Sequence, residues 1–386
     1  MTQDSLQQLA GDKLAILDAQ LLKRELVVTD RIAPGIGRRN STDLITFACN
    51  DYLGLSRHPD VIQASEEATR KFGVGAGSSR LVTGNHSLYQ RLEAQLARLK
   101  GTEDSIVFGS GYLTNIGTIP ALVGEADLIL MDENSHSCLH AGARLARSHV
   151  LTFKHNDVED AEELLRSHRA EHRHCLLLTE GVFSMDGDRA PIAALLQLAN
   201  EHDTWLMTDD AHGLGVVGDG RGSNIDNGTA LPVPLQMGTL SKAVGAYGGY
   251  LCTSRAVADL IRNRARSLIY STALPPGTVA AATKALEIIA ADHDLVRTPI
   301  ERARLFTSKL DLPAAQSPIV PLLLGSSERA LKASAHLEEA GYLVVAIRPP
   351  TVPAGTARLR CTFSAAHEVA DVEGFASAAA EALTAL

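Results

Sequence analysis

The sequence predicts an α/β protein in which helices wrap a largely parallel sheet and a second, smaller α/β lobe follows. From Ser105 onward, apolar runs of strand length recur with helical or loop segments between them, which is the rhythm of βαβ units. After the break at Pro275-Pro276, a long helical stretch leads into another set of strand-like runs. The chain of 386 residues, 45% of them hydrophobic, can bury a substantial core across two lobes.

The larger lobe is expected to follow an N-terminal arm. Residues 5–26 have the leucine spacing of an amphipathic helix, which packs either on a partner subunit or on its own domain. Residues 58–100 alternate helical segments with the loop Gly73–Gly77. Four apolar runs then predict strands of the sheet, namely Ile106–Phe108, Leu128–Met131, Leu176–Thr179 and Trp205–Thr208.

In the smaller lobe, three further runs between helical segments predict strands at Ile319–Leu324, Leu343–Ile347 and Ala357–Phe363. The sequence thus predicts three parts. Residues 1–48 form the N-terminal helix and arm, residues 49–285 the large domain and residues 286–386 the small C-terminal domain.

The composition excludes several classes of partner. The formal net charge is −9 with no basic block beside it, which argues against a nucleic-acid surface. No apolar stretch approaches the length that spans a membrane, and the N-terminus lacks the pattern of a signal peptide. Five scattered cysteines show no paired spacing, and their odd number fits a reducing compartment. We therefore expect a cytoplasmic protein that binds neither nucleic acid nor membrane.

Lys242 is the most informative residue for function. It is the only charged side chain between Asp226 and Arg255. An ammonium in an apolar setting is costly, so its pKa is expected to fall. A lysine that loses its proton near neutral pH is a nucleophile that forms Schiff bases. On this segment alone, a surface lysine in a Gly-rich loop is the alternative interpretation.

An apolar run upstream of Lys242 ends abruptly in Asp209, Asp210 and His212. Ligands of α/β sheets collect at the carboxyl ends of strands, so these residues lie where chemistry is usually done. An Asp at one strand end, followed by a Lys after the next strand, suits pyridoxal phosphate. The Asp keeps the pyridine nitrogen protonated, which makes the ring an electron sink, and the Lys holds the aldehyde.

Several motifs resemble those of the α-oxoamine synthases, pyridoxal-phosphate enzymes that join an amino acid to an acyl thioester and release carbon dioxide. The resemblance runs from about residue 20 to the C-terminus. It implies a fold-type I transferase: a large domain with a mostly parallel seven-stranded sheet, a smaller C-terminal α/β domain and an N-terminal helical arm. The motifs are Asn50-Asp-Tyr-Leu-Gly-Leu-Ser56, Glu180-Gly-Val-Phe-Ser-Met-Asp-Gly-Asp188, Asp209-Asp-Ala-His-Gly-Leu-Gly215, Gly220-Arg-Gly-Ser223, Thr239-Leu-Ser-Lys242 and Tyr270-Ser-Thr-Ala-Leu-Pro-Pro276.

A glycine-rich segment after the first predicted strand is the candidate phosphate site. It opens a helix, and backbone N–H groups at such a start, together with Ser110, form an anion pocket. The resemblance implies that Gly111 and Tyr112 hold the cofactor phosphate and that Thr239 adds a hydroxyl. An ordinary Gly-rich turn is the alternative.

The resemblance also implies a homodimer with shared active sites. Ser271 and Thr272 would donate to the phosphate of the neighbouring subunit. The sequence agrees, because the long segment Arg255–Leu268 leads away from Lys242, and a twofold neighbour offers a direct route back to a phosphate.

Three more residues take cofactor roles by the same resemblance. His136 stacks on the pyridine ring, His212 hydrogen-bonds its phenolate oxygen, and Ser184 lies near the cofactor. The family usually has Ala and then Ser after the stacking histidine, whereas this chain has Ser137 and Cys138. Lys242, once displaced by substrate, removes the Cα proton as general base.

The segment from Ala346 to Arg360 is most similar to family members that condense L-alanine with a pimeloyl thioester in biotin biosynthesis. Arg348, in a rigid loop before two prolines, suits a bidentate grip on the amino-acid carboxylate. The resemblance implies that His136 and Asn50 also contact the amino acid. It further implies that Thr351 contacts the acyl chain and that Arg24 contacts the pimeloyl carboxylate. The acyl carrier, coenzyme A or acyl carrier protein, stays open.

Other functions are weighed against this prediction. The run Gly213–Gly218 matches a dinucleotide fingerprint, but the residues after it cannot open the helix that such a site needs. His136 and His140 have a zinc-like spacing without a third ligand, so no metal is expected. The remaining alternatives are a sister synthase such as one using glycine and acetyl-CoA, and a non-enzymatic binding protein on the same fold.

Overall fold

The computed structural model describes residues 2–226 and 228–385. The chain divides into two compact units. Unit 1 comprises Met1–Cys49, Arg302–Ala315 and Ile319–Leu386, and unit 2 comprises Asn50–Glu301 and Gln316–Pro318. The three-part division predicted above stays a prediction.

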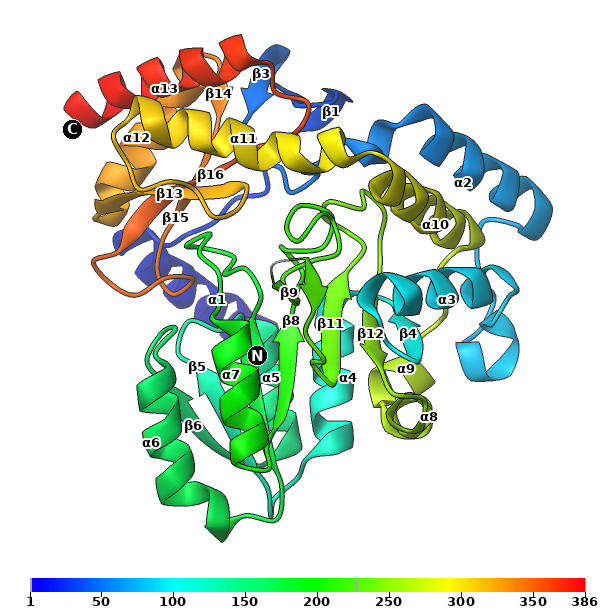
Figure 1. Ribbon diagram of the computed structural model, residues 1–386. Helices are drawn as coiled ribbons and strands as arrows, with labels where there is room; N and C mark the ends of the chain where they lie inside the picture. Colours follow the sequence, from blue (N-terminus) through cyan, green and yellow to red (C-terminus); the bar gives the residue numbers. More distant parts are fainter. Residues whose placement is uncertain (1, 227, 386) are drawn as a thin grey trace. The chain divides into compact units, whose positions relative to one another are not determined.

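Unit 2 is built on a seven-stranded sheet with the strand order β4-β12-β11-β8-β7-β5-β6 (Figure 1). β12 is antiparallel to both of its neighbours, and every other pair is parallel. The predicted mostly parallel, seven-stranded sheet is therefore confirmed. The strands are β4 (Asp104–Phe108), β5 (Leu128–Asp132), β6 (His149–Phe153), β7 (Cys175–Glu180), β8 (Trp205–Asp209), β11 (Leu235–Thr239) and β12 (Gly249–Thr253).

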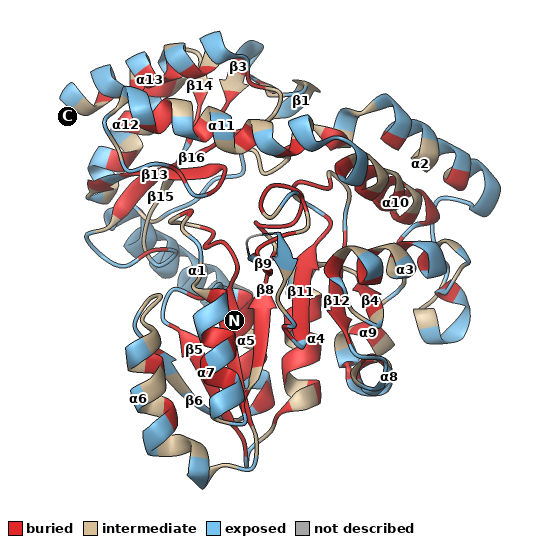
Figure 2. Cartoon of the chain, in the orientation of Figure 1, coloured by how far each residue is buried: buried red, intermediate tan, exposed pale blue. Residues whose placement is uncertain are grey.

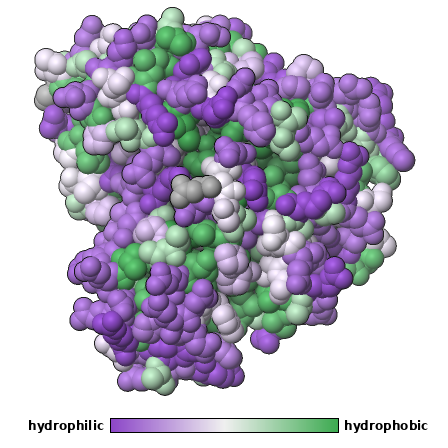
Figure 3. All heavy atoms as spheres, in the orientation of Figure 1, coloured by the Kyte–Doolittle hydropathy of each residue, from purple (hydrophilic) through white to green (hydrophobic). Residues whose placement is uncertain are grey.

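Helices cover this sheet on both faces, and the strand period of two explains why. Leu176 and Leu178 of β7 pack into one apolar cluster with α4 (Gly111–Leu122) and α5 (Ser137–Ala146). Leu177, between them, packs into another cluster with α6 (Val158–His168) and α7 (Ile192–Glu201). The strands other than the edge strand β6 are consequently buried along nearly all of their length, as Figure 2 shows, whereas β6 is largely exposed. The outer side of α6 is hydrophilic in Figure 3, and two residues of this helix, Glu163 and Arg166, are exposed.

The helices of unit 2 alternate with its strands as predicted, and small elements fill the connections. They are η1 (Leu55–Arg57), α2 (Pro59–Phe72), the π-helix η2 (Arg80–Gly84), α3 (Leu88–Lys100), α4 (Gly111–Leu122), α5 (Ser137–Ala146), α6 (Val158–His168), η3 (Arg169–Glu171), α7 (Ile192–Glu201), the short strands β9 (Ile225–Asp226) and β10 (Thr229–Ala230), α8 (Arg255–Arg264), α9 (Arg266–Ile269) and α10 (Pro276–Ala291). Along the chain, α11 (His293–Lys309) continues from unit 2 into unit 1.

Unit 1 contains two small sheets around an aromatic core. One sheet has the order β1-β2-β3-β14 and the other β13-β16-β15. The rings of Phe47 and Phe375 stack with centroids 3.9 Å apart, and Phe306 and Phe363 pack beside them. The elements are α1 (Thr2–Ala19), β1 (Asp30–Ala33), β2 (Ile36–Arg39), β3 (Thr42–Thr46), β13 (Ile319–Gly325), α12 (Ser327–Glu339), β14 (Tyr342–Leu343), β15 (Val345–Ile347), β16 (Ala357–Thr362) and α13 (Val369–Thr384).

Two sequence predictions differ from this structure. The N-terminal helix was expected over residues 5–26, but α1 ends at Ala19, and Leu21 has a left-handed backbone with φ 55° that stops the helix. The strand expected at Leu343–Ile347 is divided: Leu343 pairs with β3 and Val345 pairs with β16, so two sheets share one apolar run. Within the described part of the chain, no helix is both long and apolar enough to cross a membrane.

Candidate active site

Several of the predicted cofactor residues lie at one edge of the sheet in unit 2. β4, β5, β7, β8 and β11 point the same way, so their carboxyl ends share this edge. Asp209 is the last residue of β8 and Thr239 the last of β11, with Lys242 three positions further on. His136 lies just after β5, at the start of α5. This is the edge at which α/β sheets usually bind ligands.

Lys242 and His212 are in direct contact. The Nζ of Lys242 lies 2.7 Å from Nε2 of His212, and the Nδ1 of His212 lies 2.7 Å from the hydroxyl of Tyr52. Tyr52 donates in turn to Oδ1 of Asn50 at 3.2 Å. With the tyrosine hydrogen directed at Asn50, its oxygen accepts from Nδ1–H, which leaves Nε2 as an acceptor beside the lysine nitrogen.

Asp209 is held by neutral donors, of which the amide of Asn115 and the N–H of Ala211 are the nearest and the Cys138 sulfur, 3.9 Å from Oδ2, is the third. Its side chain is buried at 5% exposure. Oδ2 accepts from the amide of Asn115 at 2.8 Å, and Oδ1 accepts from the backbone N–H of Ala211 at 3.1 Å. These donors fix the carboxylate at the end of β8 without placing a positive charge against it.

His136 caps α5, and the next residues connect it to Asp209. Its Nδ1 accepts from the backbone N–H of Cys138 at 3.2 Å and lies 2.8 Å from the Cys138 sulfur. That sulfur also lies 3.0 Å from the amide nitrogen of Asn115. The structure thus brings the predicted stacking histidine and the predicted pyridine-nitrogen partner into one network.

The start of α4 has the chemistry of an anion site. The Oγ of Ser110 caps the helix by accepting from the N–H of Leu113 at 3.1 Å. A Cβ built on Gly111 would lie 3.3 Å from the Cβ of Thr239, so this helix start lies against the end of β11. The Thr239 hydroxyl lies 2.8 Å from that of Ser241 and donates to the carbonyl of Gly248 at 2.7 Å. Tyr112, on the first turn of α4, is half exposed.

Glu180 ends β7, and Ser184 lies in the loop that follows. The backbone N–H of Ser184 donates to Oε2 of Glu180 at 3.2 Å, and both residues are buried. Burial and, second, the Asp209 carboxylate raise the pKa of Glu180 to about 8, although Lys242 opposes this shift. Glu180 is a buried carboxyl at the site for which the sequence offered no role.

Ser271 and Thr272 follow α9 and are tied to another loop. Thr272 is exposed and forms a β-bridge with Ser79, and the N–H of Ala273 donates to the carbonyl of Ser78. Their predicted role in a neighbouring subunit stays a prediction.

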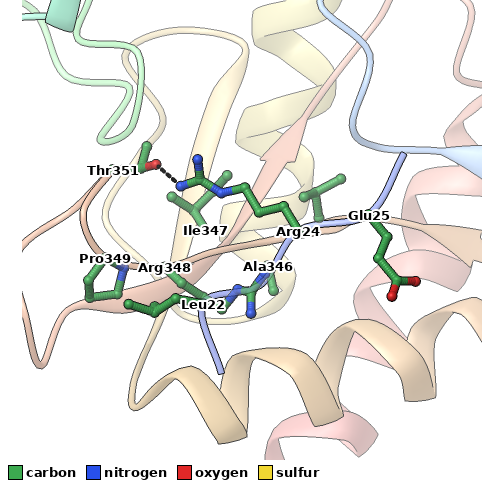
Figure 4. A pocket seen from close by; sticks show the side chains of 9 residues that line it. Leu22, Arg24, Glu25, Ala346, Ile347, Arg348, Pro349 and Thr351 are labelled. Carbon is green, nitrogen blue, oxygen red and sulfur yellow. Dashed lines mark hydrogen bonds between the residues drawn. The ribbon is translucent and has the colours of Figure 1, made fainter. Parts of the chain in front are cut away.

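Unit 1 carries the predicted substrate arginines in a pocket of about 280 Å³ (Figure 4). Arg24 points toward Thr351 and donates to its hydroxyl at 3.1 Å, whereas Glu25 points away. Arg348 donates to the backbone carbonyls of Leu21 and Lys23. Partial burial and the neighbouring Arg24 lower the pKa of Arg348, so two guanidinium groups compete for one small space. Such a pocket favours a carboxylate.

Sequence reasoning missed Tyr52, Asn115 and Cys138 as site residues. Asn115 had a detectable signal, because it lies one helical turn after Gly111 in the predicted phosphate-binding helix. Cys138 also had a signal, because it lies two residues after the predicted stacking histidine His136, whereas the contact of Tyr52 with His212 joins segments 160 residues apart and had none. Across residues 2–226 and 228–385, no three His, Cys, Asp or Glu side chains are arranged to hold a metal ion.

Comparison with known proteins shows the family. The aminotransferase class I and II family matches residues 42–378. The 8-amino-7-oxononanoate synthase of Granulibacter bethesdensis is 57% identical over 368 residues, covering 95% of each chain. That of Methylorubrum populi is 55% identical, covering 98% of this chain and 95% of its own. Serine palmitoyltransferase from S. paucimobilis, solved with a bound PLP–myriocin aldimine, is 29% identical with a TM-score of 0.91 over 99% of each chain. The two curated relatives named above, at 55–57% identity, are 8-amino-7-oxononanoate synthases, and the chain belongs to the aminotransferase class I and II family.

Proposed function

We propose that this protein is a pyridoxal-phosphate-dependent acyltransferase of biotin biosynthesis. It condenses L-alanine with a pimeloyl thioester and releases carbon dioxide, the thiol carrier and 8-amino-7-oxononanoate. The observation that carries the proposal is the placement of Lys242 against His212, at the same sheet edge as the buried Asp209. The high identity to enzymes named for this product supports the choice of substrates.

The residues at the edge fit the cofactor. Lys242 would hold its aldehyde, Asp209 its ring nitrogen and His136 its ring face. The capped start of α4, with Ser110, Gly111 and Tyr112, and the hydroxyl of Thr239 would hold its phosphate. When bound, pyridoxal phosphate supplies an electron sink that stabilises the negative charge developed at Cα.

The chain's own residues manage protons around this centre. Nε2 of His212 is 2.7 Å from Nζ of Lys242, close enough to accept a proton from the lysine. Tyr52 holds the far side of the imidazole and so fixes its orientation. Lys242 would then be the general base at the amino-acid Cα, and Asp209 would keep its negative charge toward the ring nitrogen.

The pocket of unit 1 supports a dicarboxylate-derived substrate. We propose that Arg348 binds the alanine carboxylate, and that Arg24 and Thr351 contact the pimeloyl end. Two guanidinium groups that repel each other gain most from negatively charged partners, and the free pimeloyl carboxylate and the alanine carboxylate supply one each.

A product assay tests the function directly. Purified holoenzyme is given L-alanine or glycine, each with pimeloyl-CoA or acetyl-CoA, and the products are identified by mass spectrometry. We expect 8-amino-7-oxononanoate from L-alanine and pimeloyl-CoA as the dominant product. A preference for glycine with acetyl-CoA would instead assign the chain to a sister synthase.

A matched pair of arginine variants tests the substrate site. We expect Arg24→Met to raise KM for pimeloyl-CoA about tenfold or more, because a charge-assisted hydrogen bond is lost, and to change KM for alanine little. Arg38→Met is the control, since Arg38 pairs with Asp43 on the exposed hairpin of β2 and β3. Equal effects of the two substitutions would remove Arg24 from the site.

We also propose the setting in which this activity operates. The protein works in the cytoplasm as a homodimer with shared active sites and takes pimeloyl-CoA or pimeloyl-acyl carrier protein. No disulfide joins the five cysteines in the described part of the chain, in keeping with a reducing compartment. Size-exclusion chromatography with light scattering tests the dimer, and competition between the two carriers identifies the preferred one.

A further inference from the structure

The hydrogens around Cys138 can be assigned from geometry. The backbone N–H of Cys138 donates to Nδ1 of His136, and a backbone amide can only donate. Nδ1 is therefore unprotonated, and the neutral imidazole carries its hydrogen on Nε2. The Cys138 sulfur lies 2.8 Å from the same Nδ1 and 3.9 Å from Oδ2 of Asp209, so its S–H has two acceptors within reach, and we assign it to the nearer one, Nδ1. Burial, before the weaker effect of Asp209, raises the pKa of this thiol to about 12, so the hydrogen is present.

The amide of Asn115 continues this series of bonds. Its two N–H groups point at the Cys138 sulfur, 3.0 Å away, and at Oδ2 of Asp209, 2.8 Å away. A flipped amide would place its oxygen against the carboxylate, so the orientation is determined. Asn115 is fully buried, and its own Oδ1 has no hydrogen-bond partner within the described residues.

Close packing of α4 on α5 makes these contacts possible. A Cβ on Gly142 of α5 would come within 2.7 Å of Ile119 and 3.0 Å of the Asn115 carbonyl oxygen, both on α4. Only glycine allows the helices to approach so far. The approach places the first turn of α5, which carries Cys138, against the second turn of α4, which carries Asn115.

We propose that Asn115 and Cys138 are positioning residues that couple the carboxylate of Asp209 to the tautomer of His136 through one continuous series of hydrogen bonds. In this series, the Cys138 S–H donates to His136, and the amide of Asn115 donates both to the sulfur and to Asp209. The proposal rests on the proposed function, because it assigns Asp209 and His136 to the cofactor. It goes further, because it names the atoms that hold the Asp209 carboxylate in place and keep His136 in its neutral Nε2–H form.

The charged groups around His136 explain what this coupling does to its protonation state. Asp209 on one side favours a protonated imidazole, whereas burial, Lys242 and His140 oppose it, and burial has the largest effect. Two donors on Nδ1 add to that opposition, because a protonated imidazole could not accept them. The network thus keeps His136 neutral beside an ionised carboxylate.

Cys138 variants test the sulfur. We expect Cys138→Ala to lower kcat/KM for alanine about tenfold, because a buried N–H of Asn115 loses its acceptor. It should also change the pH profile, since His136 loses one of its two donors. Cys138→Ser keeps a donor and an acceptor and should restore most of the activity. Cys175→Ala is the control, because Cys175 is equally buried in the same unit.

Asn115 variants test the hydrogen bond between Asn115 and Asp209. We expect Asn115→Leu to weaken pyridoxal phosphate about tenfold in reconstitution of the apoenzyme, because Oδ2 of Asp209 loses its donor. Thr118→Val is the control: Thr118 is fully buried on the same helix, and its hydroxyl has no hydrogen-bond partner in the described part of the chain. Urea unfolding of each variant separates loss of stability from loss of positioning.

An NMR measurement distinguishes a failure of this proposal from a failure of the proposed function. Ring ¹⁵N shifts of His136, assigned by comparison with His136→Gln, report the tautomer with and without the cofactor. We expect the Nε2–H form in the wild type and in Cys138→Ser, and a mixture in Cys138→Ala. An Nδ1–H tautomer in the wild type, or losses of equal size in Cys175→Ala and Thr118→Val, would overturn the proposal. A wild type that has the Nε2–H form but binds no pyridoxal phosphate would instead refute the function and leave the network standing.

Discussion

The Nζ of Lys100 lies 2.6 Å from Oδ2 of Asp210, and both side chains are almost completely buried. Asp210 follows Asp209 directly, yet the two carboxylates have different partners, as expected where side chains alternate at a strand end. Asp210 accepts from the N–H of Ser223, and Lys100 donates to the carbonyl of Arg221. The ion pair therefore ties together the two ends of the loop that carries His212.

Removing one partner of this pair should destabilise the protein strongly. We predict that Lys100→Met lowers the free energy of unfolding by roughly 3–5 kcal/mol, because Asp210 is left as an uncompensated buried charge. The double variant Lys100→Met/Asp210→Asn should recover part of the loss, since no net charge remains buried. Urea unfolding monitored by circular dichroism measures both. A single variant as stable as the wild type would contradict the structural role of the pair.

Lys242 is predicted to be indispensable for chemistry but not for folding. We expect Lys242→Ala to lose turnover and the absorbance band of the bound cofactor together, because no other side chain would hold the aldehyde. Its unfolding midpoint without cofactor should change little, since Lys242 is only partly buried. Lys154→Ala, at an exposed lysine, serves as the control. Turnover that survives in Lys242→Ala would exclude the proposed role.

The predicted site residues that the structure brings to the carboxyl ends of the strands share one property: each lies at or just after the end of an apolar run. Asp209 and Lys242 could be placed in this way because strand periodicity and strand ends are local signals. Asn115 could not be connected with Asp209, because 94 residues separate them and only the packing of α4 brings them together. The buried pair of Lys100 and Asp210, 110 residues apart, was hidden for the same reason.

The fold shows the same limit at the N-terminus. Leucine spacing predicted a helix to residue 26, but a helical pattern does not reveal where the backbone leaves the helix. Leu21 adopts a left-handed conformation, and Leu22 then lines the pocket of unit 1. The apolar run at Leu343–Ile347 likewise gave no sign that two different sheets divide it.

His155 should make stability depend on pH. Burial alone would lower its pKa, but hydrogen bonds to Asp132 at 3.0 Å and to Asp188 at 2.8 Å outweigh burial and raise the pKa to about 10. Because the folded-state pKa exceeds the unfolded value near 6.5, this stabilisation is complete below pH 6.5 and is lost as the pH rises through 10.

Unfolding free energies of the wild type and His155→Gln, measured from pH 6 to pH 10, check this expectation. The difference between them should be largest at the acidic end and shrink steadily as the pH rises. His293→Gln removes an exposed histidine and should show no such trend. A difference that grows with pH would contradict the assigned ion pairs.

The shared active site can be tested by mixing two inactive chains. Thr272 is exposed and bridges to Ser79, and the large apolar side chains of Leu81, Val82 and Tyr270 near this bridge are also exposed. Such a surface is typical of a subunit interface. We predict that Lys242→Ala cannot hold the cofactor and that Thr272→Asp places a carboxylate against its phosphate, so that each homodimer is inactive.

A heterodimer of the two variants distinguishes the possible arrangements. If Thr272 acts across the interface, one site receives both defects and the other receives none, so we expect about half of the wild-type activity per heterodimer. If Thr272 acts within its own chain, every site keeps one defect and mixing restores nothing. Differently tagged chains, purified in two affinity steps, ensure that heterodimers are assayed. Inactive heterodimers would therefore place Thr272 in the site of its own chain and remove the argument for a shared active site.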